Sequence, residues 1–65
     1  MSRDKANKEI LSILTNFLDK SPYLRFGQAL SILKIDADFM EEPTITLKRV
    51  RKQHRAIKLA GENND

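Results

Sequence analysis

Residues 44–61 of the chain read TITLKRVRKQHRAIKLAG, a stretch that combines dense positive charge with a regular apolar pattern. Leu47, Val50, His54 and Ile57 recur at intervals of three and four residues, which places them on one side of a helix. Six basic residues and no acidic one lie between positions 48 and 58, mostly on the other side. The stretch therefore predicts a helix that buries one face in a core and turns the other toward anions.

The beginning of this stretch leaves one structural alternative open. Residues 44–50 alternate in polarity and are rich in β-branched side chains, a pattern typical of a short strand. We favour a helix because the apolar period from Leu47 onward is helical and Pro43 suits a first turn, where its missing N–H does no harm. Gly61 suits the position just beyond a helix C-terminus. We expect this helix to begin near Pro43 and to end before Gly61.

The N-terminal part of the chain has the clearest helical period. Apolar residues recur at spacings of three and four up to Leu18, preceded by Asp4, a residue type that caps helix N-termini. Pro22 ends the pattern because it lacks the N–H that would continue the helix. We expect a first helix over residues 4–20, with Asp4 as its N-cap.

A shorter helical pattern follows the proline, from Tyr23 or Arg25 to Lys34. Gly27 interrupts it, and we interpret this glycine as a place where another backbone approaches closely. Residues 35–43 have no helical period and predict a loop whose acidic side chains stay in water. Three apolar residues of this loop are expected to reach the core: Ile35, Phe39 and Met40.

Three amphipathic helices joined by short connections predict an all-α fold, a compact three-helix bundle in one small domain. Residues 1–3 and 62–65 are expected to fray. A chain of 65 residues buries only about 60% of the surface of its unfolded form, so dimerisation is an alternative source of stability. The residues expected in the core are Ile10, Ile13, Leu14, Phe17, Leu18, Leu24, Phe26, Leu30, Leu33, Phe39, Leu47, Val50 and Ile57.

The composition excludes several classes of protein. With no Cys and one His, the chain has no disulfide, thiol redox centre or thiolate zinc site. The first ten residues are charged, unlike a secretory signal, and no apolar run approaches the roughly 20 residues of a membrane span. We therefore expect a soluble, cytoplasmic protein that does not contact a membrane.

No motif for catalysis or metal binding is present. His54, the single histidine, lies among arginines that would lower its pKa, and we interpret it as a residue of a helix face or an interface. Asp36, Asp38, Glu41 and Glu42 lack the glycine and the spacing of an EF-hand loop. We expect a non-enzyme with no catalytic residue, no metal, no cofactor and no small-molecule substrate.

The basic helix is the strongest functional feature, although the net charge is only +3. Lysines and arginines on one helical face neutralise phosphates and release counterions whatever the base sequence. Nucleic acid, or a protein that handles it, is therefore the predicted partner, and Gln53 is in a position to read a base edge. The alternative is a solvated cationic face that pairs with the acidic segment before it or with a partner protein. The predicted anion-binding residues are Lys48, Arg49, Arg51, Lys52, Arg55 and Lys58.

A second hypothesis places the function on an apolar surface of the second helix. That helix contains more apolar residues than one small core absorbs, and surplus apolar surface is typical of interfaces. The protein would then bind another protein or a second copy of itself. The predicted interface residues are Tyr23, Phe26, Ile32 and His54.

Residues 22–30 and 38–42, PYLRFGQAL and DFMEE, resemble a group of short uncharacterised bacterial and phage proteins. In that group an Arg-(Leu/Phe)-Gly-Gln motif begins a helix, and an aromatic and acidic turn follows. The resemblance implies a small helical fold and a microbial or phage origin, with a host-cytoplasmic location if the protein is phage-encoded, and it implies no activity. The alternative function is binding to an acidic or apolar protein target, as in a phage-encoded inhibitor of a host protein. The resemblance also implies that Arg25 and Gln28 share a structural role, with Arg25 bound to acids of the following loop.

Overall fold

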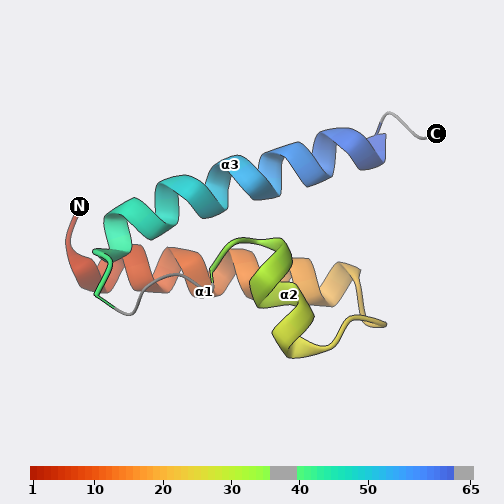
Figure 1. Cartoon of the computed structure of the whole chain (residues 1–65), viewed down its shortest axis with the longest axis horizontal. Helices are drawn as coiled ribbons and strands as arrows, with labels where there is room; N and C mark the ends of the chain where they lie inside the picture. Colours follow the sequence, from red (N-terminus) through yellow and green to blue (C-terminus); the bar gives the residue numbers. More distant parts are fainter. Residues whose placement is uncertain (36–39, 63–65) are drawn as a thin grey trace.

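The structure is a computed structural model that describes residues 1–35 and 40–62 of the chain. Within these residues it contains three helices and no strand (Figure 1): α1 (Arg3–Lys20), α2 (Phe26–Ile32) and α3 (Pro43–Glu62). The all-α prediction with three helices is confirmed, and the strand considered for residues 44–50 is wrong. α3 begins at the proline, as the missing N–H of that residue allows.

The first helix starts earlier than the sequence indicated. Ser2, and not Asp4, is the N-cap, and its Oγ accepts a hydrogen bond of 3.2 Å from the N–H of Lys5. Asp4 instead lies in the first turn, where its carboxylate interacts favourably with the positive end of the helix dipole. The expected fraying of residues 1–3 and 62–65 stays a prediction.

The second helix is shorter than predicted because both of its ends are capped. At the start, the N–H of Arg25 donates to the side-chain oxygen of Gln28 at 3.0 Å. At the end, the N–H of Lys34 donates to the Ser31 carbonyl at 3.0 Å and the N–H of Ile35 to the Leu30 carbonyl at 2.8 Å. This pair of bonds is a Schellman motif, and it places Lys34 in the left-handed region at φ 62°.

Gly27 does not mark a close contact. A Cβ built on this residue would meet no atom within 4 Å outside its immediate surroundings, so the predicted approach of another backbone is wrong. Gly61, expected just beyond the last helix, lies within the bounds of α3. Neither glycine therefore has the role that the sequence suggested.

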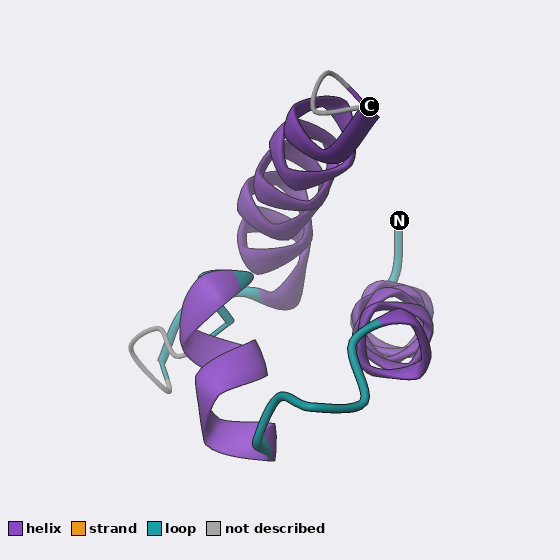
Figure 2. Cartoon of the chain, turned by 90° about the vertical axis from the view of Figure 1, so that its right-hand side faces the viewer, coloured by secondary structure: helices purple, strands orange, loops and turns teal. Residues whose placement is uncertain are grey.

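The two long helices lie side by side and run in the same direction (Figure 1). They are close near their N-termini and diverge toward their C-termini, and α2 packs across α1 on one side of the pair (Figure 2). The molecule measures 37 × 21 × 17 Å. Its radius of gyration of 12.0 Å exceeds the roughly 11 Å typical of a globular chain of this length, because α3 extends beyond the packed part.

The core follows the helical periods with a few corrections. One cluster joins all three helices, a second joins the N-terminal halves of α1 and α3, and Ile13 and Ile35 pack against both. Phe26 and Met40 were expected inside, but they are 61% and 74% exposed, and Phe39 lies outside the described residues. The fully or largely buried residues are Ala6, Ile10, Leu14, Phe17, Ala29, Leu33, Leu47 and Val50.

The left-handed conformation at Lys34 gives a stability prediction. A residue with a Cβ in this region costs about 1–2 kcal/mol relative to glycine. Glycine has more conformational freedom in the unfolded chain, and the loss of that freedom on folding offsets part of the gain. We expect Lys34→Gly to raise the free energy of unfolding by about 1 kcal/mol, or the melting temperature by about 4–8 °C. Lys34→Ala, which keeps the Cβ, is the control, and an equal gain in that variant would contradict the explanation.

Candidate nucleic-acid interface

Glu41 is the centre of a polar network that connects the end of α2, the segment before α3 and α3 itself. Arg49 donates from Nη1 and Nη2 to its two carboxylate oxygens at 2.8 and 2.7 Å, and Thr46 Oγ1 donates to Oε1 at 2.6 Å. Arg49 Nε also donates to the carbonyl of Lys34 at 3.0 Å. The hydrogen bonds from Arg49 and then Thr46 lower the pKa of Glu41 from 4.5 to about 2. Arg49 therefore fixes the end of α2 and the start of α3 to each other.

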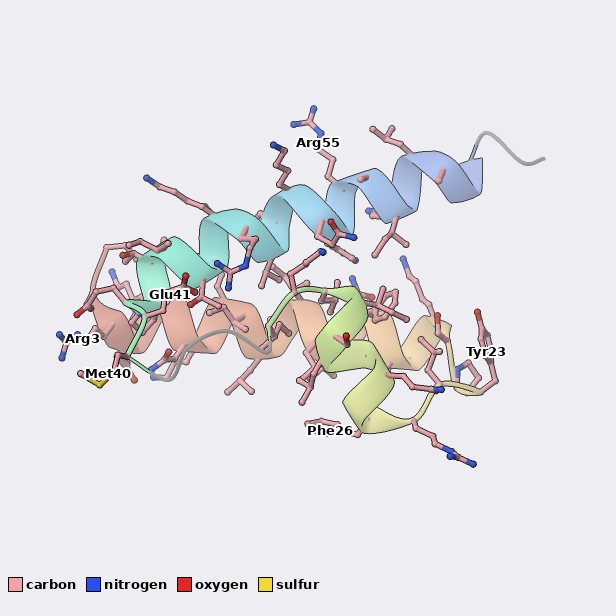
Figure 3. All side chains as sticks on the ribbon, viewed as in Figure 1. Arg3, Tyr23, Phe26, Met40, Glu41 and Arg55 are labelled. Atoms are coloured by element: carbon pink, nitrogen blue, oxygen red, sulfur yellow. The ribbon has the colours of Figure 1, made fainter. Side chains whose placement is uncertain are left out.

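Two further ion pairs connect α1 with the start and the middle of α3. Arg3 donates from Nε and Nη2 to the carboxylate of Glu42 at 2.8 and 2.6 Å, near the N-terminal ends of both helices (Figure 3). Arg51 Nη2 donates to Glu9 Oε2 across the seam between α1 and α3. Each pair is at least partly exposed, so its contribution to stability is small. Both pairs compensate the charge of an acid, Glu42 and Glu9, with an arginine.

The six predicted anion-binding residues fall into two groups. Arg49 and Arg51 make the intramolecular ion pairs described above. Lys48, Lys52, Arg55 and Lys58 are exposed and form no ion pair with any residue in the described part of the chain. We call these four residues the free basic row.

The free basic row lies on one side of α3. At about 100° per residue, its four positions and that of Arg51 fall within an arc of about 120°. Arg55 points away from α1 and α2 into solvent (Figure 3). Leu59 falls inside the same arc and is 51% exposed. Gln53 lies on roughly the opposite side of α3 from Arg55 and is half-buried, so it does not accompany the cations as predicted.

His54 belongs to the seam between α1 and α3. Its ring meets that of Phe17 edge to face, with centroids 6.3 Å apart and planes at 87°. Burial lowers the pKa of His54, and the charges of Lys58 and Lys20 add to this effect. The imidazole is therefore neutral at physiological pH. The direction agrees with the sequence prediction, although burial is a larger cause than the neighbouring cations.

Two hollows lie along the seam, one on each side of Arg51. One has a volume of about 350 Å³ and the other of about 380 Å³. Both combine cations with apolar side chains, and neither is lined by an acidic residue of the described chain. The first is lined by Ile13, Arg51, His54, Arg55, Lys58 and Leu59. The second is lined by Met1, Thr44, Leu47, Lys48 and Arg51.

The predicted apolar interface is divided in space. Tyr23 is 82% exposed beyond the C-terminal end of α1, and Phe26 lies on the side of α2 away from α3 (Figure 3). Ile32 is also exposed, on α2. His54 does not lie with these residues, because it contacts Phe17 in the seam. The exposed aromatic residues and the free basic row therefore occupy different sides of the molecule.

The arrangement differs from a helix-turn-helix reader. Ten residues, 33–42, separate α2 from α3, where that motif has a tight turn. Arg25 and Gln28, two residues of the motif, are hydrogen-bonded at the start of α2. The backbone N–H of Arg25 donates to the side-chain oxygen of Gln28. The expected contact of Arg25 with acids of the following loop does not involve Glu41 or Glu42, whose ion pairs are with Arg49 and Arg3. Its other candidates, Asp36 and Asp38, lie outside the described residues.

Comparison of the chain with protein-family models, with curated proteins and with solved structures gave no match. None of the helices in residues 1–35 and 40–62 is both long enough and apolar enough to span a membrane. Across the same residues, no three His, Cys, Asp or Glu side chains are placed to hold a metal ion.

The lowered pKa of Glu41 predicts how acid affects stability. A carboxylate whose folded-state pKa lies below its unfolded value stabilises the fold above the unfolded pKa, and this contribution disappears as the pH falls from about 5 to about 2. We expect Glu41→Gln to be less stable than the native chain at neutral pH and to lose less stability over that acidic range. Urea unfolding at a series of pH values measures both effects.

Asp4→Asn is the matched control for this series, because it removes an acid from an exposed pair with Lys8 at 3.0 Å. Such a pair contributes little, so the control should follow the native pH dependence closely. If Glu41→Gln also followed it, the network around Arg49 would not have the role assigned to it.

Proposed function

We propose that the protein is a non-enzymatic binding protein that contacts nucleic acid through the exposed basic side of α3. Lys48, Lys52, Arg55 and Lys58 neutralise backbone phosphates in this proposal. Contacts of this kind provide affinity without requiring a particular base sequence. A cytoplasmic location and a phage or bacterial origin are parts of the same proposal, as is an assembly with nucleic-acid-handling proteins.

The observation that supports the proposal is the separation of paired from unpaired charge on α3. Glu9, Glu41 and Glu42 are each bound by an arginine, so none of these acids opposes phosphate with an uncompensated charge. The free basic row has no ion pair within the described part of the chain and points to solvent over about three turns of one helix. A track of cations without internal partners is suited to a polyanion.

Charge reversal on the free basic row tests this function. We expect Lys52→Glu/Arg55→Glu to weaken binding to a labelled oligonucleotide by at least about a hundredfold at low salt, because two phosphate contacts become repulsive. Native binding should fall steeply with salt, and the variant should have a shallower dependence. Fluorescence anisotropy over a salt series gives both quantities.

The matched control is Lys5→Glu/Lys8→Glu, which makes the same change in net charge on α1. Both lysines are exposed, and only an exposed pair of Lys8 with Asp4 is lost. The two variants are compared at moderate salt, where long-range repulsion is screened over about 10 Å, and there the control should retain binding to within a few-fold. Equal losses in the two variants would show a general charge effect and would contradict a site on α3.

A second candidate function is supported by the exposure of the aromatic residues beside α2. Tyr23 and Phe26 are 82% and 61% exposed, and aromatic side chains are enriched where proteins bind one another. In this alternative the protein is an interaction module, such as an inhibitor of a host protein, or a homodimer. Because these residues lie away from the free basic row, the two functions are separable by mutation.

The homodimer form of the alternative is tested by light scattering. If the aromatic residues form a self-interface, the native chain has the mass of a dimer and Tyr23→Ser/Phe26→Ser has that of a monomer. Leu11→Ser, at another exposed apolar position on α1, is the control and should leave the mass unchanged. A native monomer over the whole concentration range would exclude self-association through these residues.

A further inference from the structure

We propose that the nucleic acid is single-stranded, and that one of its bases enters the hollow between α1 and α3 against Ile13, His54 and Leu59 while its phosphates contact Arg55 and Lys58. This inference rests on the proposed function and specifies the class of ligand. It differs from simple phosphate neutralisation because it assigns a role to a base.

The hollow beside His54 places basic side chains, which bind phosphates, next to apolar side chains, which pack against a base. Its cations, Arg51, Arg55 and Lys58, follow one another along α3, and its volume of about 350 Å³ lies within the range of about 300–1,000 Å³ typical of small-ligand sites. A separate hollow that includes Ile10 and Leu11 is lined by Glu41 and has no cation. Charge therefore favours an anionic ligand in the hollow beside His54 and not in the hollow beside Glu41.

The lining matches the chemistry of a nucleobase. A base is planar and has two apolar faces, which pack on aliphatic side chains and aromatic rings. Ile13 and Leu59 provide aliphatic carbon, and the neutral imidazole of His54 provides a ring whose orientation is fixed by its contact with Phe17. Leu59 is 51% exposed although it lies among cations, and a base would cover it.

A duplex does not meet these requirements. Its bases are stacked and paired, and extracting one costs several kcal/mol. A single strand presents unstacked bases at no such cost. The second hollow, beyond Arg51, repeats the combination of apolar and basic residues with Leu47, Met1 and Lys48, so a strand that follows α3 finds a similar surface further along.

Glu9 is an acid of α1 that lies beside this path, next to Arg51. Its carboxylate is bound by Arg51, between the two hollows, and it lines neither of them. The ion pair leaves the rest of the guanidinium on the rim of both hollows. Arg51 therefore binds Glu9 through one nitrogen, and its guanidinium also lies beside the proposed path of the strand along α3.

Four probes measured by anisotropy with the full chain test the inference. They are a labelled oligothymidylate, an abasic strand of the same length, a duplex of the same length, and polyglutamate as a competitor. We expect the intact single strand to bind at least about tenfold, or about 1.4 kcal/mol, more tightly than the abasic strand and the duplex, because only the intact strand offers an unpaired base to the hollow. Polyglutamate should compete weakly.

A pair of matched variants assigns the contact to the hollow. Leu59→Ala and Ile45→Ala each shorten an exposed apolar residue of α3, 51% and 54% exposed, and neither removes a core side chain. Leu59→Ala should bind the intact strand several-fold more weakly and the abasic strand unchanged. Ile45→Ala should bind both as the native chain does.

The outcomes separate this inference from the function on which it rests. Equal affinity for intact and abasic strands, a preference for duplex, or no effect of Leu59→Ala overturns the insertion of a base and leaves phosphate binding by α3 intact. No binding to any oligonucleotide at low salt overturns both proposals. Polyglutamate that competes as well as the intact strand assigns the surface to an acidic polypeptide and also overturns both.

Discussion

The bond between Arg49 and Glu41 is the contact on which the arrangement of the C-terminal half depends. A single guanidinium binds a carboxylate through two nitrogens and the segment just after α2 through a third, with the Lys34 carbonyl as acceptor. The planar fork of an arginine fits this set of acceptors, and a lysine would not. Because the network sets where α3 leaves the loop, it also determines which side of α3 faces α1 and which side faces solvent.

The parallel course of α1 and α3 explains the uneven distribution of charge along the chain. Parallel helices bring their N-termini, and therefore the positive ends of their dipoles, to the same end of the molecule. Asp4, Glu41 and Glu42 lie at that end, whereas Lys20 and Lys58 lie toward the negative ends. The acidic segment that precedes the basic helix in the sequence is thus, for Glu41 and Glu42, an internal electrostatic match.

The three helices and most of the core were predictable because each follows one strong period bounded by a proline. The errors come from contacts that no local pattern contains. Phe26 has the spacing of a core residue, yet it is 61% exposed at the start of α2, and Lys34 adopts a backbone conformation that its residue type does not indicate. For the candidate site, the charge density of α3 was evident, but the use of Arg49 and Arg51 by acids 8 and 42 residues away in sequence was not. The hollows beside His54 depend on how α1 and α3 diverge, which the sequence of neither helix specifies alone.

The divergence of α3 from α1 has a consequence for how binding and order are coupled. Residues 58–60, its last described side chains, are all exposed, so this end of the helix is held mainly by its own hydrogen bonds and only weakly by packing against the other helices. Helical turns without tertiary cover open locally at a small fraction of the free energy of global unfolding. Lys58 and Leu59 thus stand on the segment of α3 with the lowest local stability, and a ligand that bridges this segment to Ile13 must supply the free energy of ordering it. The cost of ordering this segment offsets part of the binding free energy, which favours a complex that forms and dissociates rapidly over one of high affinity.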